Sequence, residues 1–303
     1  MAKPLIIGTR DSQLALWQAK TIQQQLAKKG YPAELKKVKS TGDLDLDQPL
    51  YEMGITGIFT KTLDVALIND EIDIAVHSMK DVPTQLPKTI VEGAIIERAT
   101  PYDVLIPKDD LDTEKSVTIA TGSLRRKAQW LHQYPHHRTK NIRGNVQTRM
   151  RKLNETKHWK GAIFAKAGLE RMQMLPDGAV VLNWMLSAPA QGAILAVTRE
   201  HNDQARKALN EIHKTNVAAC VHQERAFLRR LEGGCTAPIG ALAELKNDEM
   251  HFHGNLTSLD GKQYFEVKRS VPVDQVDELG KSCADKILMQ GGDQLMKELR
   301  QIL

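Results

Sequence analysis

The stretch DIAVHSMKDVP at 73–83 joins an apolar strand to side chains that could do acid–base chemistry. The strand runs into His77, Lys80 and Asp81, and Pro83 then ends sheet pairing because it has no backbone N–H. A carboxylate at the end of a buried strand is well placed to act as a general acid or to stabilise a developing cation. A surface pair of Lys80 and Asp81 explains the stretch equally well, so both interpretations stay open here.

The stretch LEGGCTAPIG at 231–240 places a cysteine on a loop shaped by glycine and proline. Gly233 and Gly234 give backbone freedom before Cys235, and Pro238 constrains the chain after it. Arginine near such a thiol would lower its pKa from the usual value of about 8.5 and make it reactive. A reactive or modified cysteine and an inert loop thiol both fit this stretch.

The other two cysteines have the spacing of core residues. Cys220 and Cys283 each lie at helical spacing from apolar side chains, on the same face of a predicted helix. This spacing predicts that both thiols are buried. Three cysteines without a CxxC pair argue against a disulfide framework and against a structural zinc site. We therefore expect reduced thiols and no metal.

Two strand-to-helix junctions, IIGTRDSQLALW and TIATGSLRRKAQW, share a threonine, a serine at a helix N-cap position and nearby arginine. Helix N-termini carry unpaired N–H groups and a positive dipole, so each junction is a candidate anion site. The serines are Ser12 and Ser123, and the arginines are Arg10, Arg125 and Arg126.

Basic residues are concentrated in one segment. Residues 115–154 contain ten Lys or Arg and no Asp or Glu, whereas the whole chain has 42 basic and 37 acidic residues. A local field of one sign attracts a polyanion, although a solvated basic surface is the ordinary explanation of such a run. Several of these arginines lie beside glycines and turns, which favours an anion-binding role.

The elements that must position these residues alternate between strand and helix. Apolar runs at 5–8, 72–76, 117–120, 161–165 and 194–197 are separated by helical patterns, which predicts parallel α/β layers. After about residue 215 the order changes to a helix, three short strands at 239–245, 250–256 and 264–270, and further helices from residue 276. That part is predicted to be a separate α+β domain.

Composition and motifs exclude several classes of protein. A chain of 303 residues with 41% hydrophobic and 26% charged residues is typical of a globular protein with more than one domain. We find neither a signal-peptide pattern nor an apolar run long enough to span a membrane, so we expect a cytoplasmic protein. GxxxxGK[ST], GxGxxG, GxSxG and HExxH are absent, and His251 with His253 makes only two metal ligands.

Many stretches of the chain resemble the hydroxymethylbilane synthase family, also called the porphobilinogen deaminase family. They follow the family's order and extend from about residue 6 to residue 243. The stretches are GTRDSQLALWQ, TGD, GIFTK, DIAVHSMKDVP, TGSLRRKAQ, IRGNVQTR, AGLERM, QGAI and ERAFLRRLEGGCTAPIGA.

The resemblance implies two α/β domains like those of periplasmic binding proteins and a smaller α+β domain at the C-terminus. Their implied ranges are 1–98 with a return at 192–214, then 99–191, then 215–303 for the domain that anchors the cofactor. The implied enzyme is a transferase that joins four porphobilinogen molecules head to tail with loss of ammonia. Water then releases linear hydroxymethylbilane from a covalently bound dipyrromethane primer.

The resemblance also implies a role for individual residues. Asp81 matches the catalytic aspartate, which moves protons at the pyrrole nitrogen, and Cys235 matches the thioether anchor of the dipyrromethane cofactor. The implied cofactor contacts are Ser12, Ser78, Lys80, Thr121, Ser123, Arg125, Arg126 and Asn145. The implied substrate contacts are Arg10, Arg143, Arg149, Arg171 and Gln191.

The chain departs from the family pattern at three places. Ile55 and Thr56 occupy the middle of GITGIF, where the family often has GGKG before LF, so a basic contact there is in doubt. Gly122 replaces the first serine of the usual pair before LRR, and Pro189–Ala190 replace Val–Gly. We expect Gly122 to remove a hydroxyl contact and Pro189–Ala190 to alter hinge geometry.

Two other classes of function would explain parts of the sequence. A non-catalytic anion-binding protein of the solute-binding type would share the α/β halves but would need neither Cys235 nor Asp81. A nucleic-acid binder would use residues 115–154, and we do not expect one. The expected partner is porphobilinogen, with no nucleic acid and no membrane, and the chain is expected to be a monomer.

Overall fold

A computed structural model of the protein describes residues 3–38, 60–108, 111–232 and 237–302, which form two compact units. Within the described residues, unit 1 contains 3–38, 60–99 and 192–219. Unit 2 contains 100–108, 111–191, 220–232 and 237–302. Both units are therefore built from segments that are separate in the sequence.

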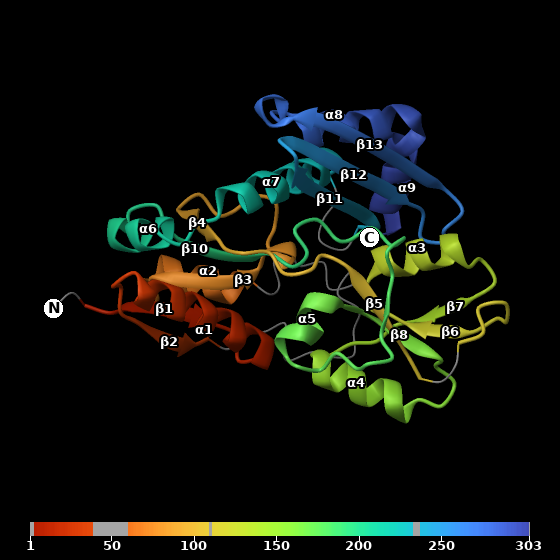
Figure 1. The fold of residues 1–303 in the computed structure, drawn as a ribbon, viewed down its shortest axis with the longest axis horizontal. Coiled ribbons are helices and arrows are strands. Elements are labelled where there is room, and N and C mark those ends of the chain that lie inside the picture. The colour runs from red at the N-terminus through yellow and green to blue at the C-terminus, as the bar shows by residue number, and fades with distance from the viewer. Residues whose placement is uncertain (1–2, 39–59, 109–110, 233–236, 303) are drawn as a thin grey trace. The chain divides into compact units, whose positions relative to one another are not determined.

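Unit 1 contains a five-stranded sheet of order β2-β1-β3-β10-β4 (Figure 1). Its strands are β1 (Leu5–Thr9), β2 (Ala33–Lys37), β3 (Ile74–Ser78), β4 (Ile90–Ile95) and β10 (Ile194–Arg199). β1 runs parallel to β2 and β3, as predicted, whereas β10 runs antiparallel to β3 and β4. The prediction of parallel layers was wrong for β10, because its continuous apolar run carries no information on strand direction.

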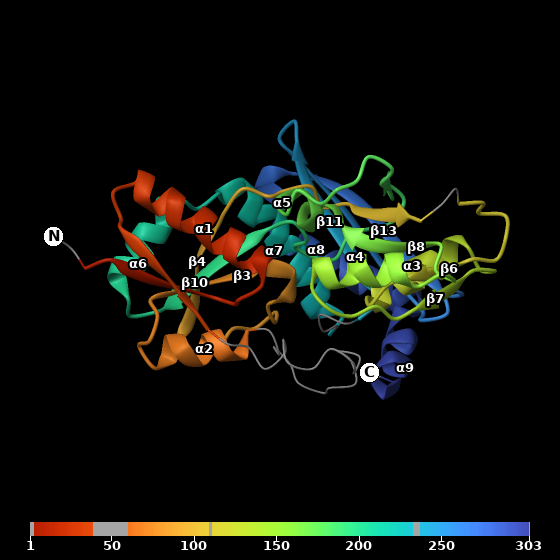
Figure 2. The same cartoon turned by 90° about the horizontal axis from the view of Figure 1, so that it is seen from below.

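Helices cover both faces of this sheet. They are α1 (Gln13–Lys28), α2 (Lys61–Ile68) and α6 (Asp203–Asn210). One face packs against α1 and α6 in a single apolar core that includes Ile7, Ile22 and Leu209. The other face packs against α2, where Leu63 lies next to Gly8; Figure 2 shows α1 and α2 on opposite sides of the strands.

Unit 2 contains a second five-stranded sheet, of order β7-β6-β8-β5-β9. Its strands are β5 (Asp103–Pro107), β6 (Thr118–Ala120), β7 (Arg138–Lys140), β8 (Gly161–Ala165) and β9 (Val180–Val181). β7, β6 and β8 are parallel, and β5 is antiparallel to β8 and β9. The two sheets therefore share one strand arrangement, and β1 and β6 occupy equivalent places in it.

Two apolar cores enclose this second sheet. Its helices are α3 (Leu124–Gln133), α4 (Val146–Glu155) and α5 (Lys166–Arg171). On one face Trp130 of α3 packs with Ile119 and Ile163. On the other face Leu153 of α4 and Leu169 of α5 pack in a separate core.

The C-terminal part of unit 2 is the predicted helix-and-sheet arrangement. Its elements are α7 (Thr215–Arg230), of which residues 215–219 belong to unit 1, β11 (Ile239–Lys246), β12 (Glu249–Thr257), β13 (Tyr264–Pro272), η4 (Val273–Gln275), α8 (Leu279–Ile287), η5 (Leu288–Gly292) and α9 (Asp293–Ile302). The three strands form an antiparallel meander. Phe227 of α7 packs on Phe252 of β12, with ring centres 5.3 Å apart. Two α/β sheets and a small α+β sheet confirm the predicted fold class.

Candidate functional site

The end of β3 places Lys80 and Asp81 between two buried residues of the short helix η3 (Met79–Asp81) and its cap. Met79 is fully buried, and its N–H donates to the carbonyl of Ala193 at 3.1 Å. Val82 is 2% exposed, and its N–H donates to the carbonyl of Met79 at 3.1 Å. Lys80 and Asp81 are half-buried, so the backbone that carries the predicted acid is anchored on both sides.

Helix α1 contacts the end of β3 through Gln18. This side chain is 2% exposed and donates from Nε2 to Oγ of Ser78 at 2.8 Å. Ser12 caps α1 as predicted, since its Oγ accepts the N–H of Ala15, and Arg10 lies half-buried just before it. Sequence reasoning missed Gln18, although a polar residue on the apolar face of a helix was a usable signal.

His77 is the unexpected group of this region. It is 6% exposed, and among the described residues its Nε2 is buried without a hydrogen-bond partner. Burial, and then the nearby positive charge of Arg10, lower the pKa of His77 to about 4. The imidazole is therefore neutral at physiological pH and adds no positive charge beside Arg10.

The β6–α3 junction of unit 2 has the predicted local structure. Ser123 is the N-cap of α3, and its Oγ accepts the N–H of Arg126 at 3.4 Å. Its own N–H donates to Oγ1 of Thr121 at 3.2 Å, and Thr121 is 5% exposed. The two predicted hydroxyl contacts thus also shape the turn from which α3 begins.

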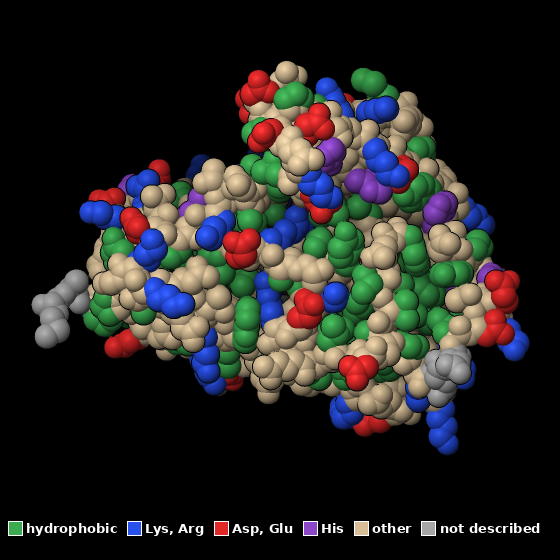
Figure 3. Space-filling view, viewed as in Figure 1, with side chains coloured by type: hydrophobic (Ala, Val, Ile, Leu, Met, Phe, Trp, Pro, Cys, Tyr) green, Lys and Arg blue, Asp and Glu red, His purple; other side chains and the backbone are tan. Residues whose placement is uncertain are grey.

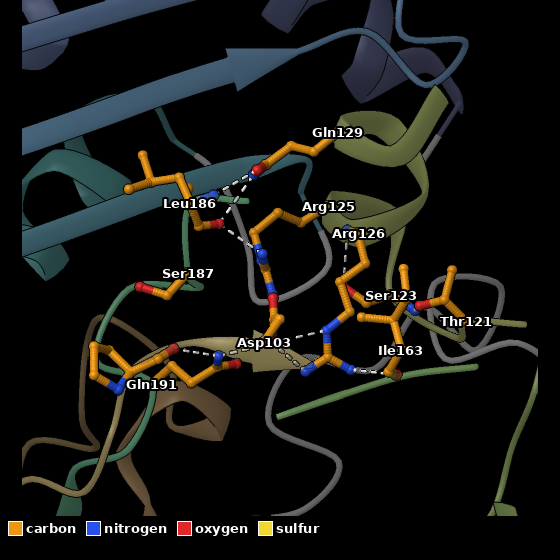
Figure 4. Close-up of polar contacts among 12 residues, drawn as sticks. Asp103, Thr121, Ser123, Arg125, Arg126, Gln129, Ile163, Leu186, Ser187 and Gln191 are labelled. Atoms are coloured by element: carbon orange, nitrogen blue, oxygen red, sulfur yellow. Dashed lines mark hydrogen bonds and ion pairs between the residues drawn. The ribbon is translucent and has the colours of Figure 1, made fainter. Parts of the chain in front are cut away.

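Asp103 binds both arginines of this junction (Figure 4). Nη2 of Arg125 donates to Oδ2 of Asp103 at 2.7 Å. Nη2 and Nε of Arg126 donate to Oδ1 at 2.8 and 3.2 Å. The remaining contacts of the pair run from Nη1 of Arg125 to the carbonyl of Leu186, at 2.6 Å, and from Nη1 of Arg126 to that of Ile163, at 3.1 Å.

Gln191 completes the surroundings of Asp103. Its Nε2 donates to Oδ1 of Asp103 at 2.8 Å and to the carbonyl of Pro101 at 2.6 Å. Burial alone would raise the pKa of Asp103, but Arg125, Arg126 and Gln191 together hold that pKa well below its usual range. Sequence reasoning predicted the three partners and missed the carboxylate that joins them.

Three more predicted residues lie at the start of α4. Asn145 is its N-cap, and its Oδ1 accepts the N–H of Thr148 at 2.9 Å. Nε of Arg149 donates to the carbonyl of Gly144 at 2.7 Å, and Arg143 is 7% exposed. Gly144 has a φ of 114°, a conformation that glycine adopts without strain.

Arg171 is the last residue of α5 and is half-buried. Burial lowers its pKa to about 10, and Glu170 partly opposes that shift. The guanidinium stays protonated at physiological pH, so it retains the charge that a carboxylate ligand requires.

Some predicted features lie outside the described residues. They are Cys235, which is the predicted cofactor anchor, and the departures Ile55 and Thr56.

The expectation that Cys220 and Cys283 are core residues is confirmed, because they are 7% and 1% exposed. Burial also raises the pKa of Cys283 to about 11, which makes its thiol a poor nucleophile.

The other two departures from the family pattern have local structural correlates. A Cβ on Gly122 would lie 2.6 Å from the carbonyl oxygen of Ile142, so the structure has no room for a side chain there. Ala190 has a φ of 61°, in the left-handed region, and its N–H donates to Oε2 of the buried Glu224 at 2.6 Å. The hydrogen bond to Glu224 holds Ala190 in a backbone conformation that glycine would adopt without strain.

Charge is distributed differently from the simplest picture of a basic surface. Figure 3 shows Lys and Arg side chains interspersed with Asp and Glu on the face that it draws. Three arginines of the basic segment, Arg125, Arg126 and Arg143, are buried. The interpretation of residues 115–154 as a solvated basic surface is therefore wrong for these three.

These residues fit organic anions better than metals. Within the described chain, no three His, Cys, Asp or Glu side chains are grouped so that they could hold a metal ion. Among the same residues, Nε of Arg125 is a buried donor without a hydrogen-bond partner, and a carboxylate is the kind of acceptor that a guanidinium N–H binds most strongly. No described helix is both long and apolar enough to span a membrane.

Two sequence models of one family match the chain. "Porphobilinogen deaminase, dipyromethane cofactor binding domain" matches residues 5–207. "Porphobilinogen deaminase, C-terminal domain" matches residues 218–289. The first model alone covers more than half of the chain, and its description supports the expected dipyrromethane cofactor.

Curated relatives match over nearly the whole length. Porphobilinogen deaminase of Desulforamulus reducens is 38% identical over 307 residues, with 99% of each chain covered. That of Chlorobium phaeobacteroides is 40% identical over 314 residues, again with 99% of each chain covered. That of Geotalea uraniireducens is 40% identical and covers 99% of this chain and 96% of its own.

Solved structures with a similar chain path include two bacterial proteins. A YaeC-family lipoprotein from Enterococcus faecalis has a TM-score of 0.42 at 15% identity and covers 72% of this chain and 94% of its own. The L-cystine solute receptor of Neisseria gonorrhoeae has a TM-score of 0.38 at 16% identity and covers 69% and 86%. Family membership rests on the sequence matches, which span both units and in which more than a third of the aligned residues are identical. The chain therefore belongs to the porphobilinogen deaminase family.

Proposed function

We propose that this chain acts as a hydroxymethylbilane synthase through Asp81 in unit 1 and through a set of arginines, of which all but Arg10 lie in unit 2. The observation that carries the proposal is the buried arginine pair at the β6–α3 junction, inside the part of the chain that matches the dipyrromethane-binding domain. The transferase joins four porphobilinogen molecules head to tail, with one ammonia lost for each bond formed. Water then releases the linear product, which is the reaction of EC 2.5.1.61.

The role proposed for Asp81 is proton transfer at the reacting pyrrole. When bound, dipyrromethane supplies the terminal pyrrole carbon to which the first substrate is joined. Asp81 would accept and return a proton at a pyrrole nitrogen and would balance the positive charge that develops as ammonia leaves. The anchoring of η3 through Met79 and Val82 supports this role, since a general acid must be held in place.

The arginines would hold the carboxylates of the pyrroles. Each pyrrole carries an acetate and a propionate, and a guanidinium can donate two parallel hydrogen bonds to such a group. Arg125 and Arg126 would bind the cofactor with the remaining cofactor contacts, which are Ser12, Ser78, Lys80, Thr121, Ser123 and Asn145. The growing chain would be bound by Arg10, Arg143, Arg149, Arg171 and Gln191.

The proposal extends to the organisation of the molecule. Three domains would comprise 1–98 with 192–214, then 99–191, then 215–303, and the position of β10 between β3 and β4 supports the return to the first domain. The chain would act as a monomer in the cytoplasm, with porphobilinogen as its partner. An anion-binding protein of the solute-binding type is not favoured, because the relatives that match the full length are deaminases by name.

Intact mass of the purified protein tests the cofactor assignment. We expect the chain to exceed its sequence mass by one dipyrromethane and Cys235→Ser to lose both that excess and the consumption of porphobilinogen. The matched controls are Cys220→Ser and Cys283→Ser, which replace buried thiols and should keep the excess. An active protein of unmodified mass would contradict the assignment.

A further inference from the structure

The charge balance around Asp103 sets a condition on any ligand of the arginine pair. Asp103 is completely buried, and Arg125 and Arg126 are 3% and 5% exposed. Two guanidinium groups against one carboxylate leave a single net positive charge on this buried cluster. Burial without that carboxylate would place two like charges side by side, which costs several kcal/mol in proteins.

The contacts of Asp103 also determine which donors the arginines can offer. A guanidinium has five N–H donors. Arg126 uses Nε and one hydrogen on each Nη toward Asp103 and Ile163, which leaves one N–H on each Nη. Arg125 uses one hydrogen on each Nη toward Asp103 and Leu186, so its Nε remains as the unpartnered buried donor.

The carboxylate is held by donors of the protein itself. Oδ1 accepts two hydrogen bonds from Arg126 and one from Gln191, and Oδ2 accepts one from Arg125. A buried carboxylate would also repel the carboxylate of a ligand. Asp103 therefore acts on a ligand only through the side chains that it holds.

We propose that Asp103 is the positioning residue of the Arg125–Arg126 pair, fixing both guanidinium groups as a monocationic receptor for one carboxylate of the pyrrole cofactor. This inference rests on the proposed function of the two arginines. It assigns to β5 a part in cofactor binding that Asp103 would play through the arginines alone. The fit is one of charge, since one net positive charge would meet one carboxylate.

The test measures the fraction of purified chains that carry the cofactor mass excess. Asp103→Asn keeps the size of the side chain and removes its charge, so we expect that fraction to fall about tenfold or more, the factor that a charge-assisted hydrogen bond contributes to binding. The control is Asn255→Ala, a buried amide of the same unit that accepts the N–H of Gly240 and makes no direct contact with either arginine in the described structure. It should stay within about twofold of the parent, because Asn255 is linked to Arg125 through Gln129, which keeps its two hydrogen bonds to Leu186 without Asn255.

Two outcomes would overturn the inference. One is full cofactor occupancy in Asp103→Asn, and the other is an equal loss in Asp103→Asn and Asn255→Ala at matched folded fractions, which would indicate general damage to the core. Should Asp103→Asn fail to fold, Asp103→Glu keeps the charge and displaces it by one methylene. We expect partial occupancy there, and full occupancy would show that the placement of the carboxylate is unimportant.

The proposed function fails in a different way. Arg125→Gln and Arg126→Gln test the arginines directly, and normal occupancy in both would contradict their role as cofactor ligands. Loss of occupancy in these two variants with full occupancy in Asp103→Asn would retain the proposed function and reject only the positioning role. A double variant, Asp103→Asn with Arg126→Gln, should lose less than the product of the two single losses, because residues that act as a unit are not additive.

Discussion

Oδ2 of Asp103 lies 2.7 Å from Nη2 of Arg125, and the two side chains are 0% and 4% exposed. Nearly all surface ion pairs are weakened by water and salt, but this one is screened by neither. Its partners come from the first residue of β5 and the first turn of α3, so it ties a strand to a helix across the second sheet. The stability of unit 2 should depend on this pair.

Acid should weaken unit 2 through Asp103. The pKa of Asp103 is held well below its usual range in the folded protein, so its contribution to the free energy of unfolding is full above a pH of about 4 and declines as the pH falls further. In a Cys235→Ser background, Asp103→Asn should lower the free energy of unfolding at pH 7 by about 3–5 kcal/mol, as when one partner of a buried pair is removed. Urea unfolding at pH 7 and pH 3 measures this, and a difference independent of pH would contradict it.

Protonation of His77 should lower the stability of unit 1, and it should do so at a higher pH than the protonation of Asp103 that weakens unit 2. The pKa of His77 is about 4 in the folded protein against the usual histidine value of 6.5, so the unfolded chain binds the proton first and stability falls from pH 6.5 down to pH 4. The lowered pKa corresponds to a loss of about 3 kcal/mol in the free energy of unfolding once His77 is protonated. His77→Gln should remove that loss in urea titrations across this range, whereas the exposed His201→Gln should behave like the parent.

Gly122→Ser restores the residue that the family usually has and should nevertheless destabilise this chain. The new Cβ would lie 2.6 Å from the carbonyl oxygen of Ile142. Crowding of this kind costs about 1–3 kcal/mol, which thermal unfolding would detect. Gly178→Ser is the matched control, because a Cβ there has nothing within 4 Å; equal melting temperatures for the two variants would contradict the expectation.

Asp81→Asn should leave the fold intact and nearly abolish the consumption of porphobilinogen. The loss of a general acid–base group lowers rates by about 10²–10⁴-fold. Asp203→Asn provides the control, since Asp203 is a 95% exposed carboxylate of the same unit. Turnover by Asp81→Asn within a few-fold of Asp203→Asn would refute the catalytic role.

Local rules predicted the turns well. Ser12 and Ser123 lie at helix N-caps as predicted, and the side chain of each accepts a backbone N–H of its own helix. The N-cap at Asn145 follows the same rule, although it was not predicted. Such contacts depend on residues within a few positions of each other, so the sequence determines them directly. The buried faces of α1 and the three strands of the C-terminal meander follow from periodicity in the same way.

Contacts between distant segments could not be predicted. Asp103 lies 22 and 23 positions before Arg125 and Arg126 and 88 positions before Gln191. Nothing in a single sequence indicates that these segments meet. An aspartate at the start of an otherwise apolar strand was a signal of the same kind as Asp81, but it did not identify its partners.

The strand order of the first sheet has a consequence for biosynthesis of the chain. β10 pairs with β3 on one side and with β4 on the other, so a ribosome must translate past residue 199 before β4 has a neighbour in the sheet. Until then β3 is an exposed edge, and such edges recruit other chains. The second sheet comprises strands within 103–181 and can close earlier. The nascent protein should therefore be most prone to misassembly just before its tenth strand emerges.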